Sequence, residues 1–304
     1  MRQKSIRGSL LLLLGSVIWG AAFAAQRAGM EHVQPFTFSG VRMLLAGFVL
    51  IPAAALAGKK RPEPGTTETK REQRRGGLIC GLLLFAATSL QQIGLVYTSA
   101  GKAGFLTALY VVLVPVTGWL LLKKQPGKVI WAGVGLAVAA LYLLCVPASG
   151  FQVERGDMML LGCAVCFTGQ ILCVDHFAPR VDGLTLARDE FLITGSLSMI
   201  IALLTETIRP DGILEALIPI LYAGILSGAV GYTLQIVGQR DVNPTVASLI
   251  MCLESVFAVL TGAVLLGERM TGREAAGCVL MFAAVILAQL STVWKGKHAK
   301  KEGR

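Results

Sequence analysis

Two ionisable residues of this chain lie deep inside long apolar stretches, where their chemistry would be unusual. Glu254 lies between the apolar runs 242–253 and 255–267, and Arg42 follows shortly after Pro35 in another such stretch. A buried carboxylate can bind a proton or an amino group, and a buried guanidinium can bind an anionic group. The structural alternatives are an ion pair with Arg42 or another cation for Glu254, and extension of the Arg42 side chain to a polar surface.

Neutral polar side chains occur in the same kind of stretch. In an apolar layer such groups need hydrogen-bond partners, so we expect them to face the interior of a helix bundle. They are Trp19, Gln91, Gln92, Tyr97, Tyr232 and Gln235. Tyr110, in contrast, is expected to serve packing.

The composition indicates the environment that these residues occupy. Hydrophobic residues make up 54% of the chain and charged residues 15%, and the mean hydropathy is +0.67. These values are typical of membrane proteins, whose helices need about 20 apolar residues to cross the bilayer. The sequence predicts an all-α integral membrane protein with ten transmembrane helices, near 8–26, 36–57, 77–97, 102–122, 128–146, 157–174, 184–205, 213–235, 244–266 and 273–293.

The formal charge of +10 does not point to nucleic acid, because the basic residues follow a membrane pattern. Lys and Arg concentrate before the first helix, in a predicted loop at 58–75, after the fourth helix, and in a basic tail at 294–304. With an even number of helices, all these segments lie on one side. The positive-inside rule then predicts cytoplasmic N- and C-termini, with the lipid bilayer as the surrounding partner.

The helices form an internal repeat. Residues 91–122 match residues 235–266 at a shift of 144, and the register continues through the next helix. Identities include Gly94/Gly238, Ala103/Ala247, Leu109/Leu253, Thr117/Thr261, Gly118/Gly262 and Leu121/Leu265. The repeats are predicted at 8–146 and 156–293. Five helices each is an odd number, so the second repeat is inverted, the architecture of alternating-access transporters.

The N-terminus also has the form of a secretory signal, with a small-residue site at Ala22-Phe23-Ala24. Its removal would leave the first repeat without its first helix. We therefore expect this segment to be the first transmembrane helix.

Four residues before Phe177 have side chains that could bind a metal ion, namely Cys163, Cys166, Cys173 and His176. On one helix the second pair begins about 10 Å beyond the first at 1.5 Å per residue. Ligands near 2.3 Å cannot share one tetrahedral ion over that distance, although half-sites completed by other helices stay open. We expect no metal and no cofactor, and no phosphate-binding loop indicates ATP. The cysteines are expected to be small packing residues.

Three consecutive charged residues, Arg188, Asp189 and Glu190, begin the predicted seventh helix. This end of the helix is predicted to be cytoplasmic. We therefore expect all three side chains to be solvated.

The residues at the end of the second repeat resemble the EamA-type transporters of the drug/metabolite transporter superfamily. The similar segments run from Ala247 through Glu254 to Gly277, echoed by Ala103–Pro115 and by Trp19-Gly20 with Phe23. Lys123-Lys124 stands where the family has Gly-Glu, which argues against a symmetric role for Glu268. Ser255 stands where proline is frequent, which concerns local helix shape. The resemblance implies a multi-pass exporter of amino acids or related metabolites in a bacterial cytoplasmic membrane. It also implies that the fifth and tenth helices serve packing or homodimer contact.

The combined hypothesis is a secondary transporter of a small-molecule solute, and not an enzyme. Its pathway is predicted to be lined by Glu254, Gln91, Gln235, Tyr232, Trp19 and Arg42. Glu254 would bind an amino group or a proton, and Arg42 a carboxylate. The alternatives are efflux of lipophilic cations, an integral-membrane enzyme on lipid-linked substrates that uses Asp189 and Glu190, and a membrane partner without solute flux.

Overall fold

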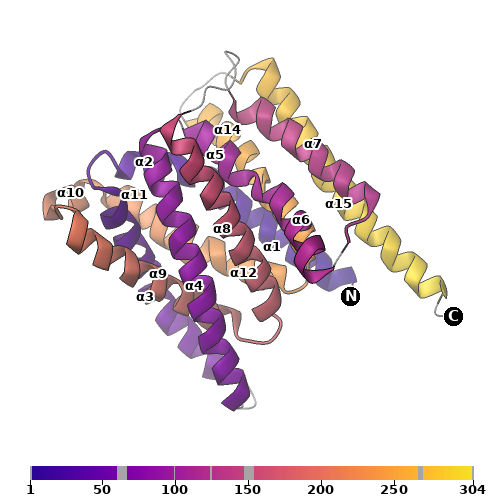
Figure 1. Cartoon of the computed structure of the whole chain (residues 1–304), viewed down its shortest axis with the longest axis horizontal. Helices are drawn as coiled ribbons and strands as arrows, with labels where there is room; N and C mark the ends of the chain where they lie inside the picture. Colours follow the sequence, from indigo (N-terminus) through magenta and orange to yellow (C-terminus); the bar gives the residue numbers. More distant parts are fainter. Residues whose placement is uncertain are drawn as a thin grey trace.

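A computed structural model describes residues 2–59, 67–98, 100–123, 125–146, 154–265 and 270–302, which are helical and contain no strand (Figure 1). The first half contains α1 (Arg2–Gly20), α2 (Ala22–Gly29), α3 (Pro35–Lys59), α4 (Thr67–Val96), α5 (Ala100–Ala108), α6 (Tyr110–Leu122) and α7 (Lys128–Cys145). The second half contains α8 (Arg155–Phe177), α9 (Gly183–Thr205), α10 (Pro210–Glu215), α11 (Leu217–Leu221), the π-helix η1 (Tyr222–Tyr232), α12 (Thr233–Gln239), α13 (Pro244–Met251), α14 (Leu253–Leu265) and α15 (Gly272–Glu302).

Within these described ranges, nine helical segments are long and apolar enough to cross a membrane. They are Lys4–Gly29, Pro35–Leu56, Glu68–Val96, Lys102–Leu121, Lys128–Cys145, Arg155–Phe177, Leu217–Gln239, Pro244–Thr261 and Gly272–Leu290. The remaining expected span corresponds to α9, which has 23 residues but carries three charged residues near its start. The fold is therefore a multi-helical membrane fold, while the count of ten stays a prediction.

Local sequence signals fix several helix starts. The Asp182 side chain accepts a hydrogen bond from the Thr185 backbone N–H at 2.8 Å and caps α9. Asn243 caps α13 in the same way, with Pro244 in the first helical position. Short polar side chains satisfy the free N–H groups of a first turn, and proline has no N–H to leave unpaired.

Equivalent residues of the two halves pack against each other reciprocally in α3 and α9. A Cβ at Gly47 would lie 2.7 Å from Leu192, and a Cβ at the equivalent Gly195 would lie 2.6 Å from the Leu44 backbone nitrogen. A contact made once in each direction between equivalent positions is the mark of two-fold symmetry. The predicted repeat is therefore a symmetry of the structure.

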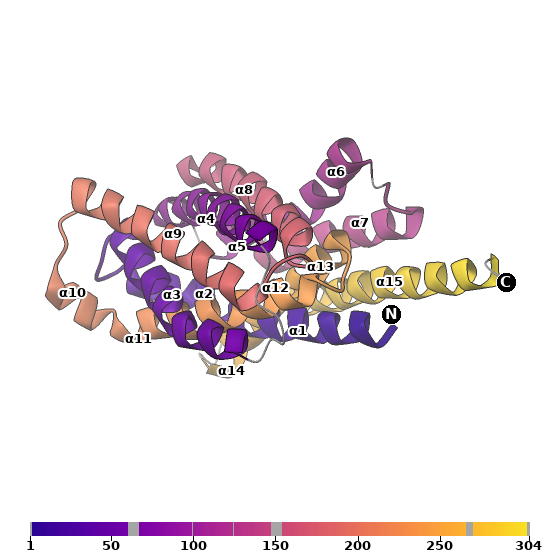
Figure 2. The same cartoon turned by 90° about the horizontal axis from the view of Figure 1, so that it is seen from below.

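The outer helices α7 and α15 are equivalent in the two repeats, and their contact shows how the repeats are oriented relative to each other. A Cβ at Gly133 would lie 3.3 Å from the Ala284 carbonyl oxygen, and one at the equivalent Gly277 would lie 3.1 Å from that of Ala140. The start of each helix thus faces a later part of the other, so the two run antiparallel, side by side in Figures 1 and 2. Equivalent helices that run in opposite directions make the second repeat inverted.

The π-helix η1 marks a difference between the repeats. Gly81 approaches the Glu190 carbonyl and Gly224 approaches the Arg42 carbonyl, so these two glycines are equivalent. Their offset is one residue smaller than that of Gly94 and Gly238. A π-helix bonds i to i+5 and accommodates an added residue, and η1 contains Gly224 and ends before Gly238.

Two segments differ from their expected form. The predicted loop 58–75 is shorter, because α3 reaches Lys59 and α4 begins at Thr67; residues 60–66 lie outside the described part. The basic tail continues α15 as far as Glu302. The N-terminal segment packs into the bundle as α1, against α12 and α14.

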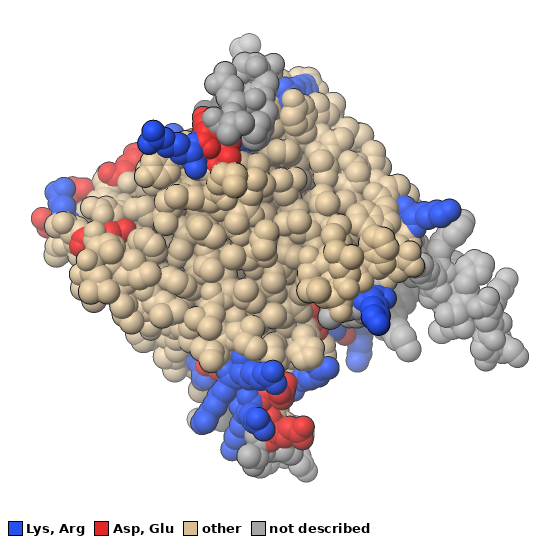
Figure 3. Space-filling view, in the orientation of Figure 1, with Lys and Arg blue, Asp and Glu red and all other residues tan. Residues whose placement is uncertain are grey.

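The charged side chains follow the membrane pattern. Figure 3 shows a broad uncharged face between charged rims, with a basic cluster at the bottom where α4 begins. Exposed basic residues there are Lys70, Arg71, Arg74 and Arg75. An uncharged band of this kind is suited to lipid, so the surface agrees with a membrane-spanning bundle.

Candidate functional site

A cavity of about 60 Å³ lies between the two halves, with room for several water molecules. Its wall comes from helices of both repeats. All six residues predicted to line the pathway lie around it, namely Trp19, Arg42, Gln91, Tyr232, Gln235 and Glu254. The wall also includes Phe23, Gln26, Thr107, Tyr110, Phe167, Ile171, Ser227 and Met251.

Glu254 occupies the first turn of α14, just after the break in the helix at Cys252. Only 8% of the residue is exposed, and its side chain is hydrogen-bonded to Tyr110. Cys252 itself keeps helical dihedrals, and the Ser255 N–H donates to its carbonyl oxygen at 3.2 Å. The Glu254 carboxylate therefore lies at the cavity wall with the Tyr110 phenol as its hydrogen-bond partner.

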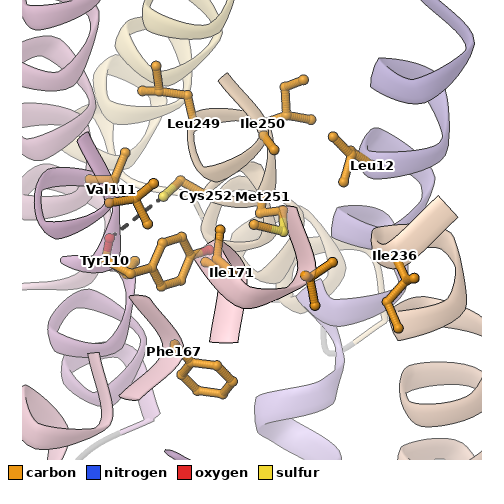
Figure 4. Packing of buried hydrophobic residues seen from close by; sticks show 14 of the residues in the cluster. Leu12, Tyr110, Val111, Phe167, Ile171, Ile236, Leu249, Ile250, Met251 and Cys252 are labelled. Carbon is orange, nitrogen blue, oxygen red and sulfur yellow. Dashed lines mark hydrogen bonds between the residues drawn. The ribbon is translucent and has the colours of Figure 1, made fainter. Parts of the chain in front are cut away.

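Tyr110 occupies the equivalent position in the first repeat, directly after the break between α5 and α6. The two breaks touch, because Cys252 Sγ donates to the Ala108 carbonyl oxygen at 3.7 Å. Figure 4 shows Tyr110 beside Cys252, Met251 and Ile171. Tyr110 therefore belongs to the cavity wall as a partner of Glu254, in addition to its packing role.

Arg42 is buried in α3, with 4% of its surface exposed. Its guanidinium lies 5.6 Å from the centre of the Phe38 ring, and its Nε has no hydrogen-bond partner. No described carboxylate lies within 4.0 Å of it. Neither extension to the protein surface nor an ion pair with Glu254 accounts for this side chain.

Aromatic rings form another side of the cavity. The rings of Trp19 and Tyr232 meet edge to face at 5.0 Å, and Phe191 contacts Tyr232 at 5.3 Å. Trp19 Nε1 donates to the Ser227 carbonyl oxygen at 3.0 Å, which joins α1 to the π-helix. This packing gives the cavity a rigid apolar wall.

Amide side chains supply hydrogen-bonding groups. Gln91 Nε2 donates to Thr107 Oγ1 at 3.4 Å. The amide oxygens of Gln26 and Gln235 are buried and have no partner. Since buried polar atoms are normally paired, these two oxygens are unsatisfied acceptors on residues of the cavity wall.

These groups together can recognise a small molecule. The wall combines one cation, one carboxylate, amide side chains and aromatic rings. Among the described residues, no group of three or more His, Cys, Asp and Glu side chains is placed to hold a metal. All seven cysteines are free.

Comparison with known proteins gives the family. The EamA-like transporter family matches the chain twice, over residues 6–146 and 154–290. The chain belongs to this family. It is therefore a multi-pass membrane protein of a transporter family, with two family repeats.

Several relatives of this EamA-like transporter are similar over most of their length. An "Uncharacterized transporter" of Archaeoglobus fulgidus is 31% identical over 290 residues, which cover 94% of this chain and 87% of the relative. A "Probable amino-acid metabolite efflux pump" of Salmonella typhimurium is 25% identical over 307 residues, covering 93% and 95%. The "Uncharacterized inner membrane transporter YedA" of Escherichia coli is 24% identical over 280 residues, covering 90% and 88%.

The same fold occurs in a solved crystal structure. That protein superposes with a TM-score of 0.77 at 20% sequence identity. The match covers 93% of this transporter and 96% of the other chain. At this level of identity the likeness concerns the fold alone.

One expectation from the sequence is wrong in this transporter. Glu190 was expected to be solvated with Arg188 and Asp189, yet it is 0% exposed and accepts a hydrogen bond from Gln170 Nε2 at 2.8 Å. Only the other two form a partly exposed pair, at 2.6 Å. In the sequence, Glu190 shares a helix face, at a spacing of four residues, with uncharged residues. This face is fully buried in the structure and consists of Leu186, Glu190, Thr194, Ser198 and Ala202.

Two further expectations had mixed outcomes. Tyr97 was expected to face the bundle interior but is 51% exposed, because it follows the end of α4. Gln92, in contrast, is fully buried, and neither end of its amide has a partner. Glu268 lies outside the described residues, so the structure gives no account of it.

Proposed function

We propose that this transporter exports small zwitterionic metabolites, such as amino acids, by alternating access without ATP. The observation that carries the proposal is that Arg42 and Glu254 line one cavity without pairing with each other. A zwitterion carries both complementary charges. It would supply each buried residue with the partner that the protein does not provide.

Each recognition group has a role in this proposal. Arg42 binds the solute carboxylate, and Glu254 binds the amino group, or a proton when the site is empty. Gln91 and Gln235 orient the solute by hydrogen bonds, and the Trp19 and Tyr232 rings enclose its apolar part. Support comes from the Salmonella relative, which is named as an amino-acid metabolite efflux pump.

The orientation follows from the distribution of basic residues. Both termini and the basic start of α4 are assigned to the cytoplasm. The Escherichia coli relative is named as an inner membrane transporter, which supports a bacterial cytoplasmic membrane. Contact between two copies through α7 and α15 stays a prediction.

Efflux of lipophilic cations is the second candidate. Glu254 with the aromatic rings of Trp19 and Tyr232 resembles a cation-binding wall. Arg42 lies on the same cavity and would repel a cation. This repulsion favours the zwitterion.

The test is mass spectrometry of the medium from cells that express the intact chain, Arg42→Gln or Glu254→Gln, after loading with dipeptides. Arg27→Gln and Glu68→Gln are matched controls, because both residues are exposed. We expect an amino acid to accumulate outside with the intact chain and both controls, but not with either cavity variant. If the medium of cells with the intact chain matches that of an empty-vector culture and the chain confers resistance to cationic dyes, efflux of lipophilic cations becomes the first candidate.

A further inference from the structure

A second buried carboxylate lies close to the cavity but is not part of its wall. Glu190 is on α9, two turns inside the helix, and is 0% exposed. One carboxylate oxygen accepts a hydrogen bond from Gln170 Nε2 of α8 at 2.8 Å. The other oxygen, Oε2, is buried and has no partner in the part of the chain that the structure describes.

Amide hydrogen bonds connect this carboxylate to the cavity. Gln235, which lines the cavity, donates through Nε2 to Gln170 Oε1 at 3.2 Å. It also donates to Gln239 Oε1 at 3.1 Å, and Gln239 is anchored on the Ile171 carbonyl oxygen at 3.4 Å. Gln170 is thus the single residue that touches both Glu190 and a residue of the cavity wall within these bonds.

Among the described residues of the helices around Glu190, no counter-charge faces it. The ionisable groups that face it are Cys80 of α4, Cys173 of α8 and Tyr232 of η1, all uncharged as thiols or phenol. The apolar part of α3 carries only Arg42, which lies at the cavity, and α12 carries none. On α9 itself, Arg188 is paired with Asp189.

A proton suits this site better than a metal ion. An anionic carboxylate buried without a cation is strongly disfavoured, and a bound proton removes the charge. Alkali and alkaline-earth ions need several oxygen ligands. Gln170 presents its N–H group to Glu190, and an N–H group cannot ligate a cation.

We propose that Glu190 is a proton-binding site of this transporter, coupled to the solute through Gln170 and Gln235. The coupling rests on the proposed function, whereas protonation of Glu190 does not. The carboxylate takes up one proton to become a neutral acid and releases the same proton in the opposite step. No other bond is made or broken.

The coupling follows from the hydrogen bonds. A solute amino group that donates to the unpaired Oε1 of Gln235 would draw this amide toward the cavity. The Gln235 bond to Gln170 would then lengthen, and Gln170 would change its bond to Glu190. By linkage, the proton on Glu190 alters solute affinity as much as the solute alters proton affinity.

The arrangement also has a counterpart in the first repeat. Arg42 occupies the position in α3 that Glu190 occupies in α9, each at the same distance from the first residue of its helix. The inverted repeats therefore carry a fixed cation on one side and a titratable carboxylate on the other. Only the second repeat can exchange a proton at this position.

Infrared spectroscopy tests the protonation. The purified protein in lipid vesicles is titrated while the protonated-carboxyl absorption is recorded, for the intact chain, Glu190→Gln, Glu254→Gln and the partly exposed control Asp189→Asn. We expect a component that fades as pH rises, absent from Glu190→Gln and present in the other two variants. An absorption unchanged in Glu190→Gln would overturn the proposal.

A second measurement tests the coupling. Vesicles containing a pH-sensitive dye are given an outward gradient of mixed neutral L-amino acids, with proton movement and amino-acid efflux both recorded. We expect the intact chain and Asp189→Asn to move protons with amino acids, and Glu190→Gln to move fewer protons per amino acid. Equal proton movement in Glu190→Gln, or dependence on sodium instead of pH, would overturn the coupling.

The infrared titration and the vesicle assay together distinguish failure of this inference from failure of the proposed function. If the intact chain moves no amino acid, the proposed function fails and the coupling fails with it. The infrared result still decides whether Glu190 binds a proton. If amino acids move but Glu190→Gln keeps the full protonated-carboxyl absorption, only the further inference fails.

Discussion

Arg42 and Glu254 are buried on one cavity, and no described residue of opposite charge lies within 4.0 Å of either. Buried charges without partners lower stability, so packing alone does not explain their presence. Ionisable residues at membrane depth are typical of substrate or ion pathways. At the scale of single residues, these two side chains therefore support our proposal that the cavity binds a ligand that brings its own charges.

Replacing Arg42 should change which solutes bind. In Arg42→Gln the affinity for an amino acid should fall by roughly tenfold to 100-fold, because a hydrogen bond to a charged group contributes about 1.5–3 kcal/mol. The affinity for the corresponding amine, which has no carboxylate, should not fall. Calorimetric binding in lipid nanodiscs measures both. An equal loss for amino acid and amine would contradict the role of Arg42.

The Trp19 side chain should contribute to stability through one hydrogen bond. In Trp19→Phe the Ser227 carbonyl loses its donor, so the free energy of unfolding should fall by about 1 kcal/mol. Trp119→Phe is the matched control, because Trp119 is 45% exposed on α6. Thermal unfolding in detergent compares the two. Equal unfolding temperatures would show that the bond to Ser227 contributes nothing.

At the scale of the elements, two helix crossings, each formed by a pair of glycines, make the same contact in the two halves. A Cβ at Gly8 of α1 would lie 2.6 Å from the Gly238 carbonyl oxygen, and one at Gly156 of α8 would lie 2.6 Å from that of Gly94. The four residues are equivalent in pairs, so each repeat closes one crossing against the other. Such close approach of backbones is available only to the smallest residues.

Enlarging a crossing should separate its helices. Gly8→Ala places a methyl group against backbone, so overpacking should destabilise the protein by about 1–3 kcal/mol. Gly135→Ala on α7 meets no atom within 4 Å and should gain about 0.5–1 kcal/mol from its better helix former. The unfolding midpoints of both variants and the intact chain, measured in the same detergent, test the two expectations. Stabilisation by both substitutions would contradict the close crossing.

The end of α6 carries a local strain that can be removed. Lys123 ends this helix with a φ of 53°, in the left-handed region that favours glycine. Lys123→Gly should stabilise the protein by about 1 kcal/mol, because a side chain there costs roughly that amount. The unfolding midpoint measures the gain, with Lys128→Gly at the start of α7 as a control expected to lose stability. A loss in both variants would argue against the strain.

The sequence predicted the elements and cavity residues that depend on local pattern. The predicted repeat is seen again in the structure, where the equivalent residues Gly47 and Gly195 lie at the contact between α3 and α9; the contact itself was not predicted. Trp19 and Glu254 meet at one cavity because an apolar layer leaves polar groups only the bundle interior.

Other features depend on tertiary contacts and were not predicted. The breaks at Leu109 and Cys252 follow residues with no helix-breaking character, and their contact joins helices far apart in sequence. The π-helix η1 reflects a one-residue mismatch between repeats. Glu190 was missed because a charged residue near a helix end is usually solvated, whereas here α4 and α8 cover it.

For the whole molecule, the two-fold symmetry relates the two glycine crossings and places the cavity between the repeats. Inverted repeats of this kind can exchange their conformations, which exposes a central site to each side of the membrane in turn. The cavity receives residues from both repeats, so their relative movement would change its shape.

Efflux from lipid vesicles tests the central claim most directly. Vesicles with the purified protein are loaded with mixed neutral amino acids, and the solutes that leave are identified by mass spectrometry. We predict efflux above that of protein-free vesicles for the intact chain and for Arg27→Gln, and none above it for Arg42→Gln or Glu254→Gln. Efflux by the intact chain that both cavity variants retain in full would contradict the assignment of this cavity as the solute site.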